Sequence, residues 1–191
     1  MRKGGSSRKG SAFERAVGRD LSRWISGGQR NDLFARNVLS GGDFTRRLKS
    51  GEGATTMPGD LMARSPLAND FMSSFLVECK HYRDLGLKSF LLDLRGNSFL
   101  ARTITLAQTQ AAASGLSWMV VAKQNNVPTL LIVGRPVAPL IMCGSPAQIE
   151  HWLHGGEFYM TLFNDFLERV DPVAFISAVV RAKTIMPRKS R

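Results

Sequence analysis

The spacing of apolar residues predicts a first helix over residues 11–26. Four apolar residues recur at helical spacing and form one stripe: Phe13, Val17, Leu21 and Trp24. Ser11 and Glu14 match the capping box that starts many helices, in which the glutamate side chain returns to the cap residue. The pair Gly27-Gly28 is expected to end the helix.

Later segments have the apolar content of short strands and further helices. The predicted strands are residues 33–39, 59–64, 73–80, 117–123 and 128–134. A helix is predicted over residues 98–114, and two more begin at Ser145 and Asp171. Residues 65–72 resemble turns, and residues 84–96 show no clear period. This order predicts an α/β fold, with a mixed central β-sheet flanked by helices and a mostly helical C-terminal extension.

The strand predicted over residues 73–80 carries two charged residues on one face. Because side chains alternate along a strand, Glu78 and Lys80 point the same way. Val77 and Cys79 point toward the opposite layer. The strand is otherwise strongly apolar, so we expect the charged pair to lie next to a packed core.

The chain is strongly basic, which changes the expected kind of partner. Its net charge is +11 and its pI is near 10.5, which favours nucleic acid or another polyanion. Residues 1–10 are predicted to form a flexible basic arm, and residues 43–57 a mobile basic loop. The residues expected to contact DNA are Arg8, Lys9, Arg15, Arg46, Arg47, Lys49 and Lys123. Ordinary solvated charge is the alternative.

Length and the remaining composition indicate one domain with an appendage. The 191 residues are 43% apolar, enough to fill a core. We expect the flexible arm at 1–10, a core over 11–136 and an extension over 137–191. Two cysteines are too few for a disulfide framework and fit a reducing compartment. No run reaches the roughly 18 apolar residues of a membrane span, so a soluble, cytoplasmic protein is expected.

Asp60 and Glu78 form a candidate metal-binding pair. Asp60 opens one predicted strand and Glu78 lies near the end of another, so the two can meet across neighbouring strands. Carboxylate oxygens and water suit Mg²⁺ or Mn²⁺. Such an ion activates a bound water and neutralises charge on a phosphate. Lys80 can orient that water or stabilise the charged transition state.

Each candidate also has a purely structural interpretation. Glu78 and Lys80 can form a solvated surface pair, and Glu14 can act only within the capping box. The segment Ser40-Gly41-Gly42 can hold a phosphate or simply turn the chain.

Other kinds of site have little support in the sequence. His151 and His154 are three apart on a predicted helix, but no cysteine or carboxylate pattern supports a zinc site. The glycine pairs lack the strand and helix context of a dinucleotide site.

Four segments occur in the order found in one nuclease family. They are Lys9-Gly10-Ser11-Ala12-Phe13-Glu14-Arg15, Ser40-Gly41-Gly42, Pro58-Gly59-Asp60 and Val77-Glu78-Cys79-Lys80. This set resembles the archaeal-type Holliday junction resolvases of the PD-(D/E)xK nuclease superfamily, which also has phage relatives. The resemblance covers roughly residues 8–134.

The resemblance implies a restriction-endonuclease-like core built as helix, three strands, helix and strand. It also implies Mg²⁺-dependent cleavage, with Mn²⁺ able to substitute, by a homodimer that cuts two strands of branched DNA. By position, Glu14, Asp60 and Glu78 match the metal carboxylates. Lys80 matches the catalytic lysine and Ser40 the loop serine.

The chain departs from the family pattern in three places. Asp60 follows Pro-Gly rather than proline directly, the loop over residues 43–57 is long, and the segment after residue 136 exceeds a compact resolvase core. The sequence predicts a metal-dependent DNA endonuclease, foremost a junction resolvase, acting in the host cytoplasm if a phage encodes it. The alternatives are a restriction-like, nicking or repair nuclease acting on linear duplex DNA, and a non-catalytic basic DNA-binding protein.

Overall fold

The computed structural model describes residues 5–37, 58–92, 98–134, 137, 153–155 and 158–185. The predicted loop over 43–57 and the predicted helix start at Ser145 lie outside these residues. Within the described ranges, none of the helices combines the length and apolar content needed to cross a bilayer.

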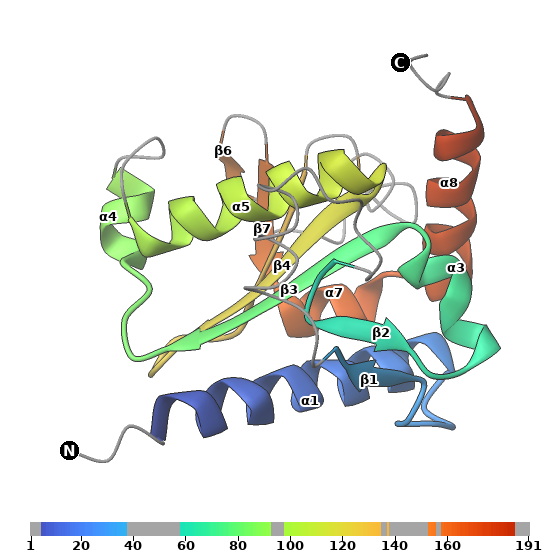
Figure 1. Cartoon of the computed structure of the whole chain (residues 1–191), viewed down its shortest axis with the longest axis horizontal. Helices are drawn as coiled ribbons and strands as arrows, with labels where there is room; N and C mark the ends of the chain where they lie inside the picture. Colours follow the sequence, from blue (N-terminus) through green and yellow to red (C-terminus); the bar gives the residue numbers. More distant parts are fainter. Residues whose placement is uncertain are drawn as a thin grey trace.

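A mixed β-sheet of five described strands forms the centre of the molecule (Figure 1). In spatial order the strands are β3 (Phe75–Tyr82), β4 (Ser117–Gln124), β5 (Leu130–Gly134), β7 (Phe158–Leu162) and β6 (Leu153–Gly155). β3 and β4 are parallel, and the other neighbours are antiparallel. A parallel pair needs a crossover, which contains α5 (Phe99–Ser114). The predicted α/β fold with a mixed, helix-flanked sheet is confirmed.

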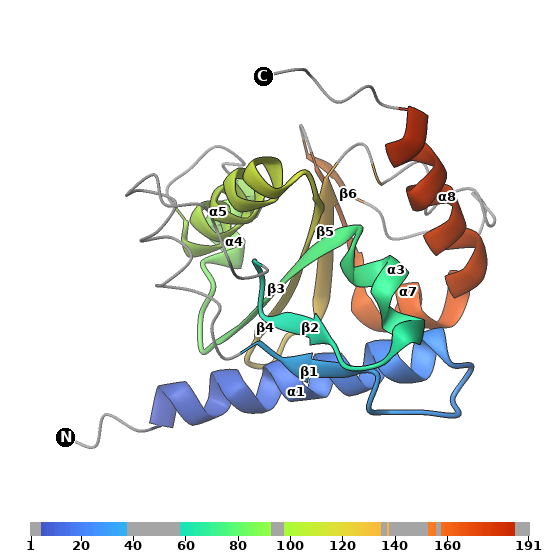
Figure 2. The ribbon, with the colours of Figure 1, turned by 45° about the vertical axis from the view of Figure 1, so that its right-hand side comes forward.

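Two apolar cores lie on the two faces of this sheet. One core is covered by α1 (Gly5–Ile25), the ribbon of β1 (Phe34–Arg36) and β2 (Leu61–Ala63), α3 (Asn69–Met72), α7 (Phe163–Arg169) and α8 (Pro172–Ile185). The other is covered by α4 (Leu87–Leu92) and α5. Figure 2 shows the sheet nearly edge-on between these groups of helices. Along β3, Val77 and Cys79 pack into the first core and Leu76 into the second, which confirms the predicted alternation.

Helix α1 confirms the predicted apolar stripe but begins six residues earlier than residue 11. The four stripe residues are buried in the first core: Phe13, Val17, Leu21 and Trp24. Ser11 therefore lies inside the helix, and the predicted capping box is wrong. The predicted end is confirmed, because Gly27 and Gly28 have positive φ values of 61° and 86°. The Gly28 amide donates a hydrogen bond of 2.7 Å to the Arg23 carbonyl.

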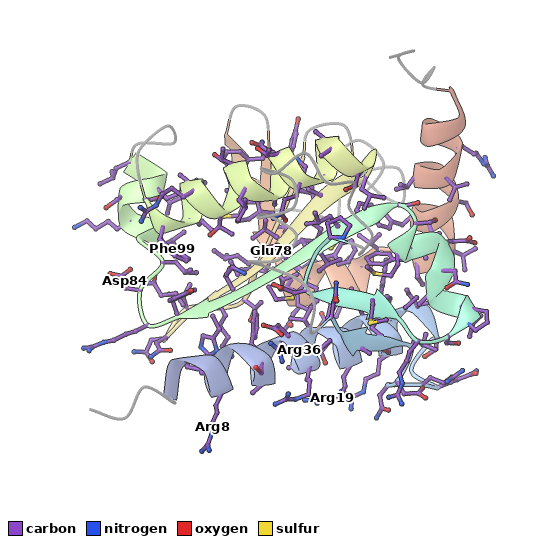
Figure 3. All side chains as sticks on the ribbon, in the orientation of Figure 1. Arg8, Arg19, Arg36, Glu78, Asp84 and Phe99 are labelled. Atoms are coloured by element: carbon purple, nitrogen blue, oxygen red, sulfur yellow. The ribbon has the colours of Figure 1, made fainter. Side chains whose placement is uncertain are left out.

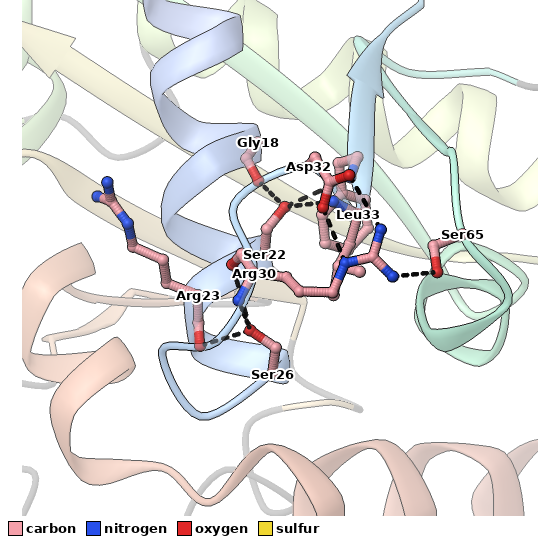
Figure 4. Close-up of polar contacts among 9 residues, drawn as sticks. Gly18, Ser22, Arg23, Ser26, Arg30, Asp32, Leu33 and Ser65 are labelled. Carbon is pink, nitrogen blue, oxygen red and sulfur yellow. Dashed lines mark hydrogen bonds and ion pairs between the residues drawn. The ribbon is translucent and has the colours of Figure 1, made fainter.

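Buried Ser22 joins α1 to the start of β1 (Figure 4). Its hydroxyl donates to the Gly18 carbonyl at 2.6 Å. The same oxygen accepts from the amides of Leu33 at 3.0 Å and Phe34 at 3.4 Å. One side chain thus satisfies backbone groups at the turn between the two elements.

Ser22→Ala is expected to lower the free energy of unfolding by about 2 kcal/mol, because buried amides lose their acceptor. Urea denaturation of both proteins measures this difference. Ser89→Ala, an exposed position on α4, is the matched control and should change stability by less than about 0.5 kcal/mol. Equal effects of the two substitutions would contradict the structural role of Ser22.

The C-terminal part contains strands that the sequence pattern did not reveal. β7 pairs with β5 over five residues, so the central sheet extends beyond residue 136. Among the described residues after 136, α7 (Phe163–Arg169) and α8 (Pro172–Ile185) are longer than the two strands, so this part is mostly helical as predicted. The division of the chain at residue 136 stays a prediction. The predicted helix at Asp171 is confirmed as α8, and the Asp171 side chain accepts from the Ala174 amide at 2.7 Å.

Other boundaries differ from the sequence predictions in detail. Residues 65–72 contain a short 3-10 helix (Pro66–Ala68) and α3 instead of turns alone, and residues 84–96 contain α4. The strand predicted over 33–39 is the three-residue β1. α5 begins after its cap Ser98 and ends at left-handed Gly115, as predicted.

Candidate active site

Asp60 lies against the middle of β3, immediately before β2. Its amide donates to the Val77 carbonyl at 2.8 Å, and its side-chain Oδ2 accepts from the Cys79 amide at 2.8 Å. These two bonds fix both the backbone and the carboxylate of Asp60 beside Glu78. The predicted proximity of the two acidic residues is therefore confirmed, but not as neighbouring strands of one sheet, because β2 pairs with β1 in a separate two-stranded sheet.

Gly59 makes this close approach possible. Its φ is +95°, a backbone conformation that L side chains rarely adopt. A Cβ at this position would lie 3.0 Å from the Val77 carbonyl oxygen and 3.1 Å from the Val77 nitrogen. Asn37 supports the same turn, since its side-chain amide donates to the Gly59 carbonyl at 3.0 Å. Because Gly59 has no side chain, the backbone between Pro58 and Asp60 can pack directly against the backbone of β3 at Val77.

Lys80 lies between the two carboxylates. Its Nζ is 3.4 Å from Asp60 Oδ2 and forms an ion pair with Glu78 Oε1. It also lies 3.4 Å from the Cys79 carbonyl oxygen. The Asp60 and Glu78 side chains are each only 10% exposed, and that of Lys80 is 24% exposed. The three residues form one largely buried network, which does not fit the alternative of a solvated surface pair.

The protonation of this network depends on its burial. Burial raises the pKa of the Glu78 carboxyl group, and the Asp60 carboxylate raises it further, while Lys80 opposes both effects. Burial alone would lower the pKa of Lys80, but the carboxylates of Glu78 and Asp60 outweigh burial and raise it. Lys80 is consequently an ammonium group at neutral pH. The carboxylates of Asp60 and Glu78 thus keep the buried Lys80 side chain positively charged.

Glu14 lies near this network but is paired elsewhere. It forms an ion pair with Arg36 of β1, and its charge makes a small contribution to the raised pKa of Glu78. Among the described residues, no three histidine, cysteine or acidic side chains converge as a metal-binding group. The proposed metal role of Glu14 therefore stays a prediction.

The donors around Lys80 fit a hard divalent cation. Carboxylate oxygens of Asp60 and Glu78 and the carbonyl oxygen of Cys79 all lie around one positively charged nitrogen. Oxygen donors of this kind suit Mg²⁺ or Mn²⁺. Asp60 and Glu78 are thus the residues best placed to hold such an ion.

The remaining predicted site residues are scattered. Arg8 and Arg15 are exposed on α1, Lys123 lies near the end of β4, and Lys9 donates to the Asn125 side chain at 2.7 Å. Figure 3 shows Arg8 and Arg19 pointing from α1 away from the sheet, while Glu78 lies on β3. Several candidates lie outside the described residues: Ser40, Arg46, Arg47, Lys49 and His151.

The predicted helical spacing of His151 and His154 is wrong, because His154 lies on strand β6. Sequence reasoning also missed Arg36 and Asn37. No local signal identifies their partners, since both partners lie 22 residues away along the chain.

One protein-family comparison decides the affiliation of the chain. The family described as "Phage putative PDDEXK endonuclease" matches residues 5–139. The chain belongs to this endonuclease family. The matched region of this PDDEXK family member includes Glu14, Asp60, Glu78 and Lys80. No curated protein and no solved structure matches the chain significantly.

Membership supports the coarser part of the sequence prediction. The chain is a member of a phage-related PD-(D/E)xK nuclease family, and nucleases of this kind act on DNA with divalent metal ions. The buried acidic pair and its neighbouring lysine lie within the matched range, residues 5–139, and their catalytic role stays a prediction.

Proposed function

We propose that this protein is a Mg²⁺-dependent DNA endonuclease that resolves four-way junctions as a homodimer in the host-cell cytoplasm. The observation that carries the nuclease proposal is the buried network of Asp60, Glu78 and Lys80 in a member of a PDDEXK endonuclease family. The junction substrate and the homodimer rest on the motif resemblance to archaeal-type resolvases. Mn²⁺ is expected to substitute for Mg²⁺.

Asp60 and Glu78 would hold the ion, with the Cys79 carbonyl as a further oxygen donor. The bound ion would supply a water of lowered pKa and neutralise charge at the scissile phosphate. Hydrolysis forms a bond between the water oxygen and phosphorus and breaks the bond to the 3′ oxygen. It leaves a 5′-phosphate and a 3′-hydroxyl.

Lys80 would act as a cation and not as a general base. Without metal, the carboxylates of Glu78 and Asp60 raise the pKa of Lys80 against the effect of burial, so Lys80 is an ammonium group at neutral pH. An ammonium group next to the reacting phosphate would stabilise the negative charge of the transition state. Glu14 would add charge to the centre through water once it leaves Arg36.

The experiment that tests this function compares a labelled four-way junction with its component duplexes, in Mg²⁺ and in chelator. Paired, symmetric nicks confined to the junction and lost in chelator would support the resolvase. Equal cleavage of linear duplex would retain the nuclease and overturn the junction substrate. Tight binding without metal-dependent cleavage by the folded protein would overturn the nuclease in favour of a DNA-binding protein.

The affinity for Mn²⁺ is expected to rise as the pH increases above about 4.5, the ordinary pKa of glutamate. Because burial raises the pKa of Glu78, a proton competes with the metal at pH values where an exposed glutamate is already ionised. Because the pKa of Glu78 is higher in the folded than in the unfolded protein, its proton stabilises the metal-free fold at low pH. This contribution to the free energy of unfolding is lost as the pH rises through the folded-state pKa. Calorimetric titration with Mn²⁺ across this range measures the effect. Glu78→Gln should weaken binding and reduce its pH dependence, and an unchanged profile in the variant would contradict the assignment.

A further inference from the structure

A basic groove lies between α1 and the β1–β2 ribbon, and Glu14 is one of the residues that line it. Its volume is about 330 Å³. Four arginines from separate elements line it: Arg15 and Arg19 of α1, Arg36 of β1, and Arg64 directly after β2. Residues that are up to 49 positions apart in the sequence thus place their guanidinium groups along one groove.

Among the described residues that line this groove, the four arginines outnumber the two acidic residues. Its two acidic lining residues are already paired, Glu14 with Arg36 and Asp32 with Arg30 at 2.9 Å. Arg15, Arg19 and Arg64 are exposed, and none forms an ion pair with an acidic side chain of the described residues. Arg19 and Arg64 interact with the charges of Asp20 and Asp32 without forming an ion pair, so within the described residues all three guanidinium groups are accessible to an anionic ligand.

Two residues that line the groove relate it to the candidate active site, although Asp60, Glu78 and Lys80 do not line it themselves. Leu61, which lines it, directly follows Asp60 in the sequence. Glu14 also lines it, and the charge of Glu14 acts on Glu78. An anionic chain lying in the groove would therefore pass near the turn that carries Asp60.

The chemistry of the groove suits a phosphate backbone and not nucleobases. A guanidinium group offers a planar fork of donors that matches phosphate oxygens. Arg15 and Arg19 are four residues apart, about 6 Å along the helix axis. The aromatic lining residue among those described is Phe34, which is only 6% exposed and offers no face for base stacking.

We propose that this groove binds the sugar-phosphate backbone of DNA adjacent to the scissile bond, with phosphates held by Arg15, Arg19 and Arg64. The idea that the DNA strand bound in the groove is also the strand that is cleaved rests on the proposed nuclease function. A phosphate next to Arg36 would compete with Glu14 for its guanidinium group. The ordinary alternative is a set of solvated arginines that takes no part in binding.

The test uses the double variant Arg19→Gln/Arg64→Gln of the full chain. A control, Arg102→Gln/Arg181→Gln, removes the same charge from exposed positions on α5 and α8. Binding of a labelled duplex is measured in chelator over a series of salt concentrations. Loss of two phosphate contacts should weaken binding about tenfold at low salt and reduce the slope of log K against log salt by about 2. The control variant should show the same slope as the wild-type protein. The variant Arg19→Lys/Arg64→Lys keeps both charges, so its slope should be close to that of the wild-type protein.

Uncharged methylphosphonate linkages, placed one at a time in the duplex, locate the contact. In the wild-type complex, we expect such a linkage near the cleavage position to weaken binding, and the same linkage should have little further effect on the glutamine double variant. If the glutamine variant binds like the control at every salt concentration, the groove proposal is overturned. Because DNA binding is measured without metal, this test does not depend on cleavage. Weakened binding by the glutamine variant would support the groove proposal even if the protein never cleaves DNA. Normal binding by the variants of an active nuclease would refute the groove proposal and leave the nuclease proposal intact.

Discussion

Glu78→Gln and Asp60→Asn are each expected to lower the rate of Mg²⁺-dependent DNA cleavage by about a thousandfold or more. Both substitutions keep the size of the side chain and remove the negative charge that would hold the metal. The loss should be large because the two carboxylates lie in a largely buried network, where a cation that loses a charged ligand is poorly compensated. Single-turnover cleavage at saturating enzyme measures the chemical step directly.

Matched controls separate charge removal at this site from charge removal in general. Glu168→Gln on α7 and Asp70→Asn on α3 change exposed acids of the same types and should retain full cleavage. Thermal unfolding without metal should show that all four variants are folded. A folded Glu78→Gln protein that keeps more than about a tenth of the wild-type rate would contradict the metal role of Glu78.

Gly59→Ala is expected to lower the free energy of unfolding by about 3 kcal/mol and to reduce cleavage as well. The positive φ alone costs an alanine roughly 1–2 kcal/mol. The added methyl group would also meet the backbone of Val77 at 3.0 Å, so β2 or β3 must shift. Such a shift would move Asp60, whose carboxylate is held by the Cys79 amide of β3. Urea denaturation and single-turnover cleavage measure the two effects.

Gly27→Ala provides the control for the conformational part of this cost. Gly27 also has a positive φ, of 61°, but no other atom lies within 4 Å of the place that an added Cβ would occupy. This variant should lose only about 1 kcal/mol and cleave DNA normally. If the two alanine variants are equally stable and equally active, the close approach of Gly59 to β3 is not what positions Asp60.

Local patterns in the sequence were sufficient for several elements of the fold. The apolar stripe on α1 predicted its buried face, and the apolar segments of β3, β4 and β5 predicted strands. Helix α5 was bounded correctly by Ser98 and Gly115, because a cap hydrogen bond and a left-handed glycine act within a few residues. The period of two along β3 also placed Glu78 and Lys80 on one face.

The capping box failed because a matching pair of residues does not determine where a helix begins. Ser11 and Glu14 have the right spacing, yet α1 continues N-terminally to Gly5, and Glu14 pairs with Arg36 instead. Strand β7 was missed for a related reason. Its five residues become a strand by pairing with β5, a contact that the local pattern did not reveal.

The sequence by itself determined several of the helices and strands, the basic charge and the order of the four motif segments, because these depend on residue identity and short-range spacing. Only the tertiary structure decided which of the motif residues meet. It brought Asp60 onto β3 through the turn at Gly59, and it paired Glu14 with Arg36. It also gathered arginines from α1, β1 and the end of β2 into one groove. These contacts join residues far apart in the sequence, and they depend on strand pairing and helix packing that no local pattern encodes.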